Sequence, residues 1–196
     1  MTSQTNLIIN FKNRRTLVDS LNRDDYKVAV EVGVRTGWFS KYMLDNTKMT
    51  VYSIDPWEDN EELKESQKVY AECKSRLEDY QERSVMIKDY SPQAAVNFGD
   101  EQVDFVYIDG LHDYQSVKKD IEAWWKKLRI GGILAGHDFN TAKWTGVVRA
   151  VSEFCDENNL SCYLTGIVGN SIQSRTGDLD EYDGDEKSWV IFKAHA

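Results

Sequence analysis

The chain has 196 residues, of which 41% are hydrophobic, and this is enough for one domain with a substantial core. Its 33 acidic residues outnumber its 24 basic residues, which gives a formal net charge of −9. Because no run of basic residues stands out, the sequence disfavours a nucleic-acid partner and an anionic membrane surface, both of which require clustered Lys and Arg.

Short apolar runs that end at Gly, Asp or Pro predict five buried strands. In chain order these runs cover residues 27–32, 49–54, 84–87, 103–108 and 132–135. A helix is expected to begin near Trp38, and apolar residues recur at helical spacing over 60–80, 114–128 and 145–158. We expect the glycine pair at 131–132 to stop the helix over 114–128. This alternation of strands and helices is typical of a parallel sheet with helices on both faces.

Two further strands, over 161–166 and 188–193, follow one another without a helix between them, so we expect an antiparallel pair at one edge. The predicted fold is therefore α/β: a Rossmann-like three-layer sandwich with a mostly parallel, seven-stranded sheet and an antiparallel edge hairpin. We interpret residues 1–196 as a single domain. Within it, 1–25 form an N-terminal segment that is a candidate acceptor lid, and 167–187 form a solvated acidic loop.

Three widely spaced cysteines without a CxxC motif indicate free thiols rather than a disulfide framework or a zinc site. We find no signal-peptide core and no apolar run of the roughly 20 residues that span a bilayer. These features predict a protein of a reducing, cytoplasmic compartment with no membrane partner.

Residues that can bind a ligand or take part in a reaction gather where the predicted strands end. In an open parallel sheet, ligands bind beyond the carboxyl ends of the strands, so these side chains should lie around one site. The candidates are Glu31, Gly33, Gly37, Asp55, Asp89, Ser91, Asp109, His112, His137 and Asp138.

The first strand leads into a turn from Glu31 to Gly37 with G-x-x-x-G spacing. Gly33 and Gly37 would let the backbone turn sharply and approach a ligand, and the following helix would point its N–H groups toward it. A glycine turn without a ligand fits this pattern equally well. Asp55 favours a ligand, because an acid after the second strand can accept both hydroxyls of a ribose, although by itself it fits a helix cap or a turn before Pro56 as well. Together they predict a nucleoside-type ligand.

The E-V-G-x-x-x-G turn, the acid after the second strand and the glycine-bounded fifth strand resemble class I S-adenosylmethionine-dependent methyltransferases. More narrowly, DGLHDY (109–114) and GGILAGHDF (131–139) resemble a bacterial and phage subgroup with D-G-x-H-x-Y and H-D-F signatures. That subgroup is similar to the metal-dependent sugar O-methyltransferases of macrolide biosynthesis.

The resemblance implies that S-adenosylmethionine is the cofactor and assigns residues to its parts. Glu31, Gly33 and Gly37 would hold the methionine part, and Asp55 would hold the ribose. Asp89 and Ser91 would lie near the adenine.

The same resemblance implies a catalytic centre that includes Asp109, which would also face the cofactor. Asp109 and Asp138 would bind Mg²⁺, and His112 would be the general base. Some relatives have a carboxylate as third metal ligand where this chain has Tyr114 or His137, and His137 is the candidate for that place.

Two other classes of function compete with this interpretation. One is a Rossmann-type oxidoreductase that uses a nicotinamide cofactor, against which the missing G-x-G-x-x-G motif argues. The other is a non-catalytic cofactor-binding module. The acceptor is expected to be a small molecule, a sugar or another hydroxylated compound by analogy, and association into a homo-oligomer is left open.

Overall fold

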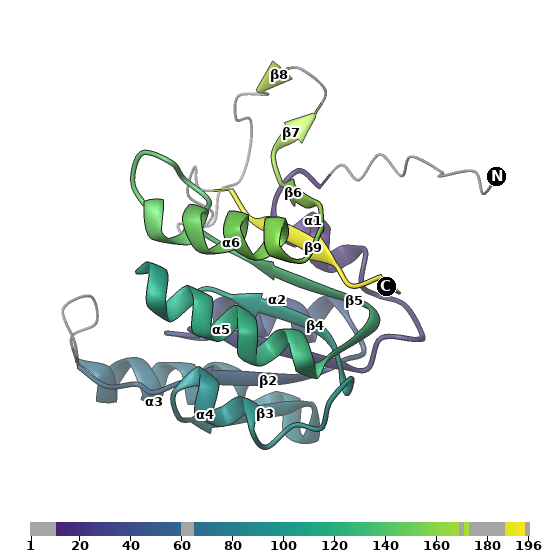
Figure 1. The fold of residues 1–196 in the computed structure, drawn as a ribbon. Helices are drawn as coiled ribbons and strands as arrows, with labels where there is room; N and C mark the ends of the chain where they lie inside the picture. The colour runs from purple at the N-terminus through teal and green to yellow at the C-terminus, as the bar shows by residue number, and fades with distance from the viewer. Residues whose placement is uncertain (1–10, 60–64, 169–170, 173–186, 195–196) are drawn as a thin grey trace.

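The computed structural model describes residues 11–59, 65–168, 171–172 and 187–194. Its main sheet has seven strands in the order β3-β2-β1-β4-β5-β9-β6 (Figure 1). The strands are β1 (Val28–Val32), β2 (Thr50–Asp55), β3 (Ser84–Lys88), β4 (Val103–Ile108), β5 (Leu128–Gly136), β6 (Cys162–Leu164) and β9 (Trp189–Phe192).

The first five strands run parallel, and β9 pairs antiparallel with β5 on one side and β6 on the other. The strand order reverses between β1 and β4, which lie side by side although β2 and β3 separate them in the chain. The predicted α/β sandwich with an antiparallel edge is confirmed. The reversal point, where ligands bind in open α/β sheets, lies at the carboxyl ends of β1 and β4.

Alternate residues of each strand face opposite layers of helices (Figure 1). Val30 and Val106 pack in one core with the helices α4 (Ser91–Ala95), α5 (Tyr114–Lys127) and α6 (Thr145–Glu157). Ala29 and Phe105 pack in the other core with α1 (Arg14–Asp19), α2 (Trp38–Asn46) and α3 (Ser66–Leu77). The strands can therefore be continuously apolar, because both of their faces are buried.

The expected helix stop at 131–132 is wrong. Helix α5 ends at Lys127, and β5 begins at once with Leu128, which is buried and pairs with Val103. The glycine pair lies inside the strand, where Gly131 has φ +80° and the pairing register shifts between Val103 and Phe105. Because Leu128 is buried, the strand begins at residue 128, which is four residues before the predicted run over 132–135.

Two other predicted boundaries also change. The expected helix over 60–80 divides into α3 and a 3-10 helix, η1 (Glu78–Arg83), and residues 60–64 lie outside the described part. Within the predicted acidic loop, β7 (Ile167–Val168) and β8 (Ser171–Ile172) form a small antiparallel pair. The acidic residues 178–186 themselves lie outside the described residues.

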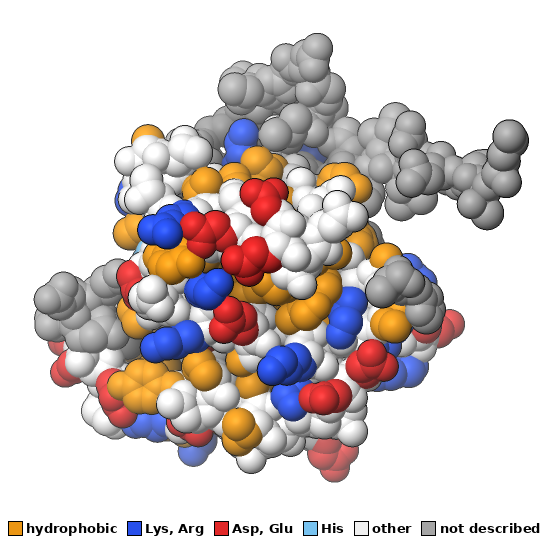
Figure 2. All heavy atoms as spheres, in the orientation of Figure 1, with side chains coloured by type: hydrophobic (Ala, Val, Ile, Leu, Met, Phe, Trp, Pro, Cys, Tyr) orange, Lys and Arg blue, Asp and Glu red, His pale blue; other side chains and the backbone are white. Residues whose placement is uncertain are grey.

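Figure 2 shows the face that α4, α5 and α6 cover, with basic side chains interspersed among acidic and hydrophobic ones. An interspersed pattern differs from the clustered Lys and Arg of a nucleic-acid interface. Across the described residues, no helix combines the length and apolar character needed to cross a membrane.

Candidate active site

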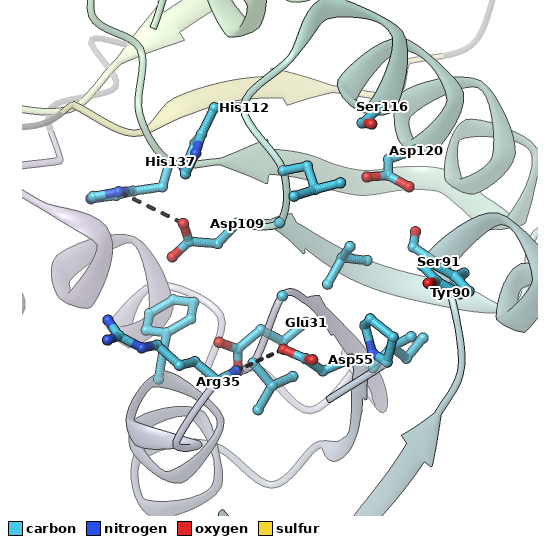
Figure 3. Close-up of a pocket in the computed structure, with 18 of the residues that line it drawn as sticks. Glu31, Arg35, Asp55, Tyr90, Ser91, Asp109, His112, Ser116, Asp120 and His137 are labelled. Carbon is cyan, nitrogen blue, oxygen red and sulfur yellow. Dashed lines mark hydrogen bonds and ion pairs between the residues drawn. The ribbon is translucent and has the colours of Figure 1, made fainter. Parts of the chain in front are cut away.

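A cavity of about 670 Å³ opens at the carboxyl ends of the parallel strands (Figure 3). It brings together seven predicted site residues from five strand ends: Glu31, Gly33, Asp55, Ser91, Asp109, His112 and His137. Asp138 lies next to this cavity and contacts both histidines. Gly37 and Asp89 do not line it.

The missing Cβ atoms of the two glycines of the turn make room for neighbouring parts of the protein. A Cβ on Gly33 would lie 2.1 Å from the carbonyl oxygen of Asp109, and one on Gly37 would lie 2.8 Å from Sγ of Cys73. Both residues also have left-handed backbone, with φ +84° and +80°. The sequence correctly identified a sharp turn, but its glycines allow the β1 and β4 loops and helix α3 to approach one another.

Glu31 is a buried carboxyl group at the bottom of the cavity. Its side chain is on the face of β1 that α2 covers, where the Ser40 hydroxyl donates a hydrogen bond to it. Burial raises the pKa of Glu31 to about 8, and the nearby Asp109 adds to this effect. The folded protein therefore keeps a proton on Glu31 at a pH where the unfolded chain, with a pKa near 4.5, has lost it.

Glu31→Gln is therefore expected to stabilise the protein at high pH. A raised pKa of an acid means that the folded state binds more protons, so the stability of the wild type falls as the pH rises from about 4.5 to about 8. The glutamine cannot ionise, and we expect it to gain roughly 2–4 kcal/mol relative to wild type at alkaline pH. Denaturant unfolding at acidic and alkaline pH measures this gain. A difference that is the same at both pH values would contradict it.

Asp55 is held by two backbone N–H groups at the end of β2. Its Oδ2 accepts a hydrogen bond from the N–H of Arg35 at 2.9 Å, and its Oδ1 accepts one from the N–H of Trp57 at 2.7 Å. The carboxylate thus ties the loop after β1 to the loop after β2. Each oxygen keeps a second lone pair that can accept from a ligand hydroxyl.

The chain after β3 places Tyr90 and Ser91 at the cavity, whereas Asp89 accepts a hydrogen bond from the N–H of Tyr90 at 2.8 Å. Ser91 Oγ accepts a hydrogen bond from the indole N–H of Trp124 at 2.9 Å. Asp120 of α5 points toward Ser91 in the same part of the cavity (Figure 3). Asp120 was not among the predicted site residues, and it lies among the apolar residues of the inner face of α5.

Asp109, His137 and Asp138 form a compact cluster at the ends of β4 and β5. One ligand atom from each lies within 4.8 Å of the others. His137 Nδ1 is 3.3 Å from Asp138 Oδ1 and 3.8 Å from Asp109 Oδ1. Tyr114, the alternative third ligand, instead donates from its hydroxyl to Glu153 at 2.5 Å. The spacing therefore supports His137 in that place.

The charges of this cluster act on one another. Burial raises the pKa of Asp109, although His137 and Arg14 oppose this change. Asp138 is also buried, but hydrogen bonds from His112 and His137 hold its pKa below the usual range. Burial alone would lower the pKa of His137, but the hydrogen bond to Asp138 and the charge of Asp109 raise it. The cluster thus contains one firmly ionised carboxylate and one that is costly to ionise.

His112 joins the cluster through Asp138. Its Nε2 lies 2.9 Å from Asp138 Oδ2, and its ring stacks on Trp144 with centroids 3.9 Å apart. The Nδ1 atom is buried. In the contact with Asp138, the Nε2–H donates to the carboxylate, so the lone pair of the neutral ring is on Nδ1.

Arg14 is a residue of this site that the sequence did not reveal. It belongs to α1 in the N-terminal segment, lines the cavity, and forms an ion pair with Asp109 at 3.2 Å between Nη1 and Oδ2. Its guanidinium group also lies over the ring of Phe39, 4.9 Å from the centroid. The N-terminal segment thus contributes a cation to the part of the cavity where the acids converge.

The family model named "Methyltransferase domain" matches residues 30–139, which is more than half of the chain. The chain therefore belongs to this methyltransferase family. Together with the sheet order, the match identifies an enzyme of the S-adenosylmethionine-dependent methyltransferase class, as predicted. It favours methyl transfer over the hydride transfer of a nicotinamide enzyme. A search of curated proteins gives no match.

Solved structures share the fold at low sequence identity. An O-methyltransferase from Bacillus cereus, in complex with SAH, has a TM-score of 0.62 and 18% identity over 91% of this chain and 78% of its own. A putative methyltransferase from Streptococcus mutans, also with SAH, has a TM-score of 0.61 and 15% identity over 91% and 94%. An rRNA methylase from Streptococcus thermophilus has a TM-score of 0.62 and 16% identity over 93% and 95%.

Proposed function

We propose that this enzyme transfers the methyl group of S-adenosylmethionine to a hydroxyl group of a sugar or another small cytoplasmic molecule. The observation that carries the proposal is that Glu31 and Asp55 line the same cavity as Asp109, His112 and His137. The net charge of −9 supports a small acceptor over a nucleic acid.

The proposed cofactor extends along the strand ends. Asp55 would bind the ribose hydroxyls, with its carboxylate already oriented by the N–H groups of Arg35 and Trp57. Glu31 and the turn after β1 would contact the methionine part. Tyr90 and Ser91, rather than Asp89, would lie beside the adenine.

The residues around Asp109 fit a divalent cation. Two carboxylates and an imidazole converge within 4.8 Å, and oxygen-rich sets of this kind suit Mg²⁺. Asp109, Asp138 and His137 would hold the ion. A bound Mg²⁺ would lower the pKa of a coordinated acceptor hydroxyl and thus make it a better nucleophile.

Methyl transfer from a sulfonium is a displacement in which the protein positions the reactants and accepts a proton. The acceptor oxygen forms a bond to the methyl carbon while the bond between that carbon and sulfur breaks. The bonding pair returns to sulfur, which leaves S-adenosylhomocysteine. The remaining hydroxyl proton must go to a base, and His112 is the imidazole of the cavity that we assign to this role.

Asp138 would support His112 in this role. A proton taken up at Nδ1 would make the ring an imidazolium, whose Nε2–H would donate to Asp138 Oδ2, at the present separation of 2.9 Å, in a charge-assisted hydrogen bond. The Nδ1 atom is buried in this structure, so the side chains around it must move before it can reach the acceptor proton. Trp144 keeps the ring in plane during this exchange, because it stacks on the face of the imidazole.

A screen of nucleotide-sugars, free sugars and phenols, with and without Mg²⁺, tests the proposal through the release of S-adenosylhomocysteine. We expect turnover of a hydroxylated acceptor, its loss on chelation, and a decrease of about 10²–10⁴-fold in His112→Gln. S-adenosylhomocysteine should bind His112→Gln as tightly as wild type by calorimetry. Turnover that survives chelation would refute the metal, and turnover that survives His112→Gln would refute the base.

A further inference from the structure

The end of the cavity remote from His112 contains a buried acid to which no role has been given. Asp120 is 6% exposed and lies on the inner face of α5, next to the core residues Ile121 and Trp124. Its carboxylate faces Ser91 across the cavity (Figure 3). An apolar residue would pack at this position without the cost of burying a carboxylate, so the acid calls for a ligand-related explanation.

A chain of hydrogen bonds fixes Asp120. The indole N–H of Trp124 donates to Ser91 Oγ at 2.9 Å, and the Ser91 hydroxyl hydrogen-bonds to the Asp120 carboxylate. Because an indole only donates, the serine oxygen must accept from it, and its single proton is then available for Asp120. Because Ser91 supplies only one proton, the carboxylate keeps further lone pairs that can accept hydrogen bonds from a molecule in the cavity.

The Asp120 carboxylate is a strong hydrogen-bond acceptor, and its protein neighbours stabilise its negative charge only in part. Burial raises its pKa to about 6, Asp113 adds to this change, and the Ser91 hydrogen bond opposes it. The ionised form still predominates at neutral pH. A donor from a ligand would stabilise this form in a region where water is largely excluded.

The surroundings of Asp120 suit a flat heterocycle. Ile54, Pro92 and Leu111 are apolar residues of the cavity wall, and Asp120 and Ser91 provide a polar edge. Ser91 follows β3, which lies beyond β2 and Asp55 in the strand order, and Asp120 faces Ser91 (Figure 3), on the side to which the base of a ribose-bound nucleoside would extend. The placement of the nucleoside rests on the proposed function.

We infer that Asp120 selects the methyl donor by accepting a hydrogen bond from the exocyclic 6-amino group of its adenine ring. A 6-oxo purine would instead present an oxygen lone pair to the carboxylate, and two acceptors repel. Sites that hydrogen-bond a ligand group discriminate strongly against an analogue that leaves their buried polar atoms without a partner. Asp120 is thus a specificity-determining residue of the cofactor site.

Calorimetry with the full chain tests this inference by comparing S-adenosylhomocysteine with S-inosylhomocysteine, its 6-oxo analogue. We expect the wild type to bind the 6-amino compound on the order of 10–100-fold more tightly. Asp120→Asn keeps the size and the acceptor for Ser91 but adds an amide donor. We expect this variant to bind S-adenosylhomocysteine about 10-fold more weakly and to prefer it by no more than about 3-fold.

Glu122→Gln is the matched control, because Glu122 is an exposed acid on the same helix. We expect it to leave both affinities unchanged, and thermal unfolding verifies that each variant is folded. A wild-type preference retained in Asp120→Asn would overturn the inference. A wild type that binds both compounds equally would overturn it while leaving the proposed cofactor in place. A wild type that binds neither would overturn both.

Discussion

Asp109→Asn is expected to abolish divalent-cation binding and to lower methyl transfer by roughly 10²–10³-fold, the contribution of several kcal/mol that a metal makes at a reacting oxygen. Asp109 lies at the end of β4 with one oxygen toward His137 and the other toward Arg14. The amide keeps the shape but removes the negative charge, and with it the ion pair to Arg14. Mn²⁺ binding followed by electron paramagnetic resonance, together with rates of S-adenosylhomocysteine release, measures both effects.

Asp113→Asn is the appropriate control for this prediction. Asp113 is an exposed acid four residues further on, where its side chain caps α5 by accepting from the N–H groups of Gln115 and Ser116. Asparagine is an equally good N-cap residue, so the fold should be unaffected. Equal cation affinity in Asp109→Asn and Asp113→Asn would show that Asp109 is not a metal ligand.

The affinity for the cation should also depend on pH in a definite direction. Metal ligands must be deprotonated, and the pKa values of both Asp109 and His137 are raised. Protons therefore compete with the cation at both groups, and the affinity should increase as the pH rises. Asp138 remains ionised throughout, because its pKa is held below the usual range.

The sequence predicted the sheet well because the signal for its strands is local. The run over 103–108 has the bounds that the structure shows, since six consecutive residues are buried and Asp109-Gly110 follows them. The start of β5 was predicted less well. Leu128 joins the strand because it is buried against a partner strand 25 residues earlier, and no property of residues 128–131 alone reports that pairing.

The same distinction between local and long-range signals applies to the residues of the site. Glu31, Asp55, Asp109 and His137 follow predicted strands, and the parallel sheet must bring such strand ends together. Arg14 and Asp120 reach the cavity from helices on opposite faces of the sheet. Their place depends on how α1 and α5 pack, which is a long-range property. A charged residue within an apolar helical stripe, as at Asp120, is the signal that could have revealed one of them.

Gly33 shows a different limit of prediction from the sequence. The sequence identified the residue but not the part of the protein that it contacts. Gly33→Ala is expected to destabilise the protein by roughly 3–5 kcal/mol. The new Cβ would meet the carbonyl oxygen of Asp109 at 2.1 Å and Gly110 Cα at 2.6 Å, and both are backbone atoms that cannot turn away as a side chain could. The φ of +84° adds strain for any residue with a Cβ.

Gly110→Ala provides the contrast, because it adds the same methyl group on the other side of this contact. Its Cβ would lie 3.7 Å from Val32 Cγ1 and 3.9 Å from Asp120 Oδ2, which are ordinary packing distances. Urea unfolding should therefore give a loss of less than about 1 kcal/mol for Gly110→Ala and several times more for Gly33→Ala. Similar losses in the two variants would contradict the view that Gly33 sets the approach of the β1 and β4 loops. Since that approach places Glu31 beside Asp109, any Gly33→Ala protein that still folds should also bind S-adenosylhomocysteine more weakly than wild type.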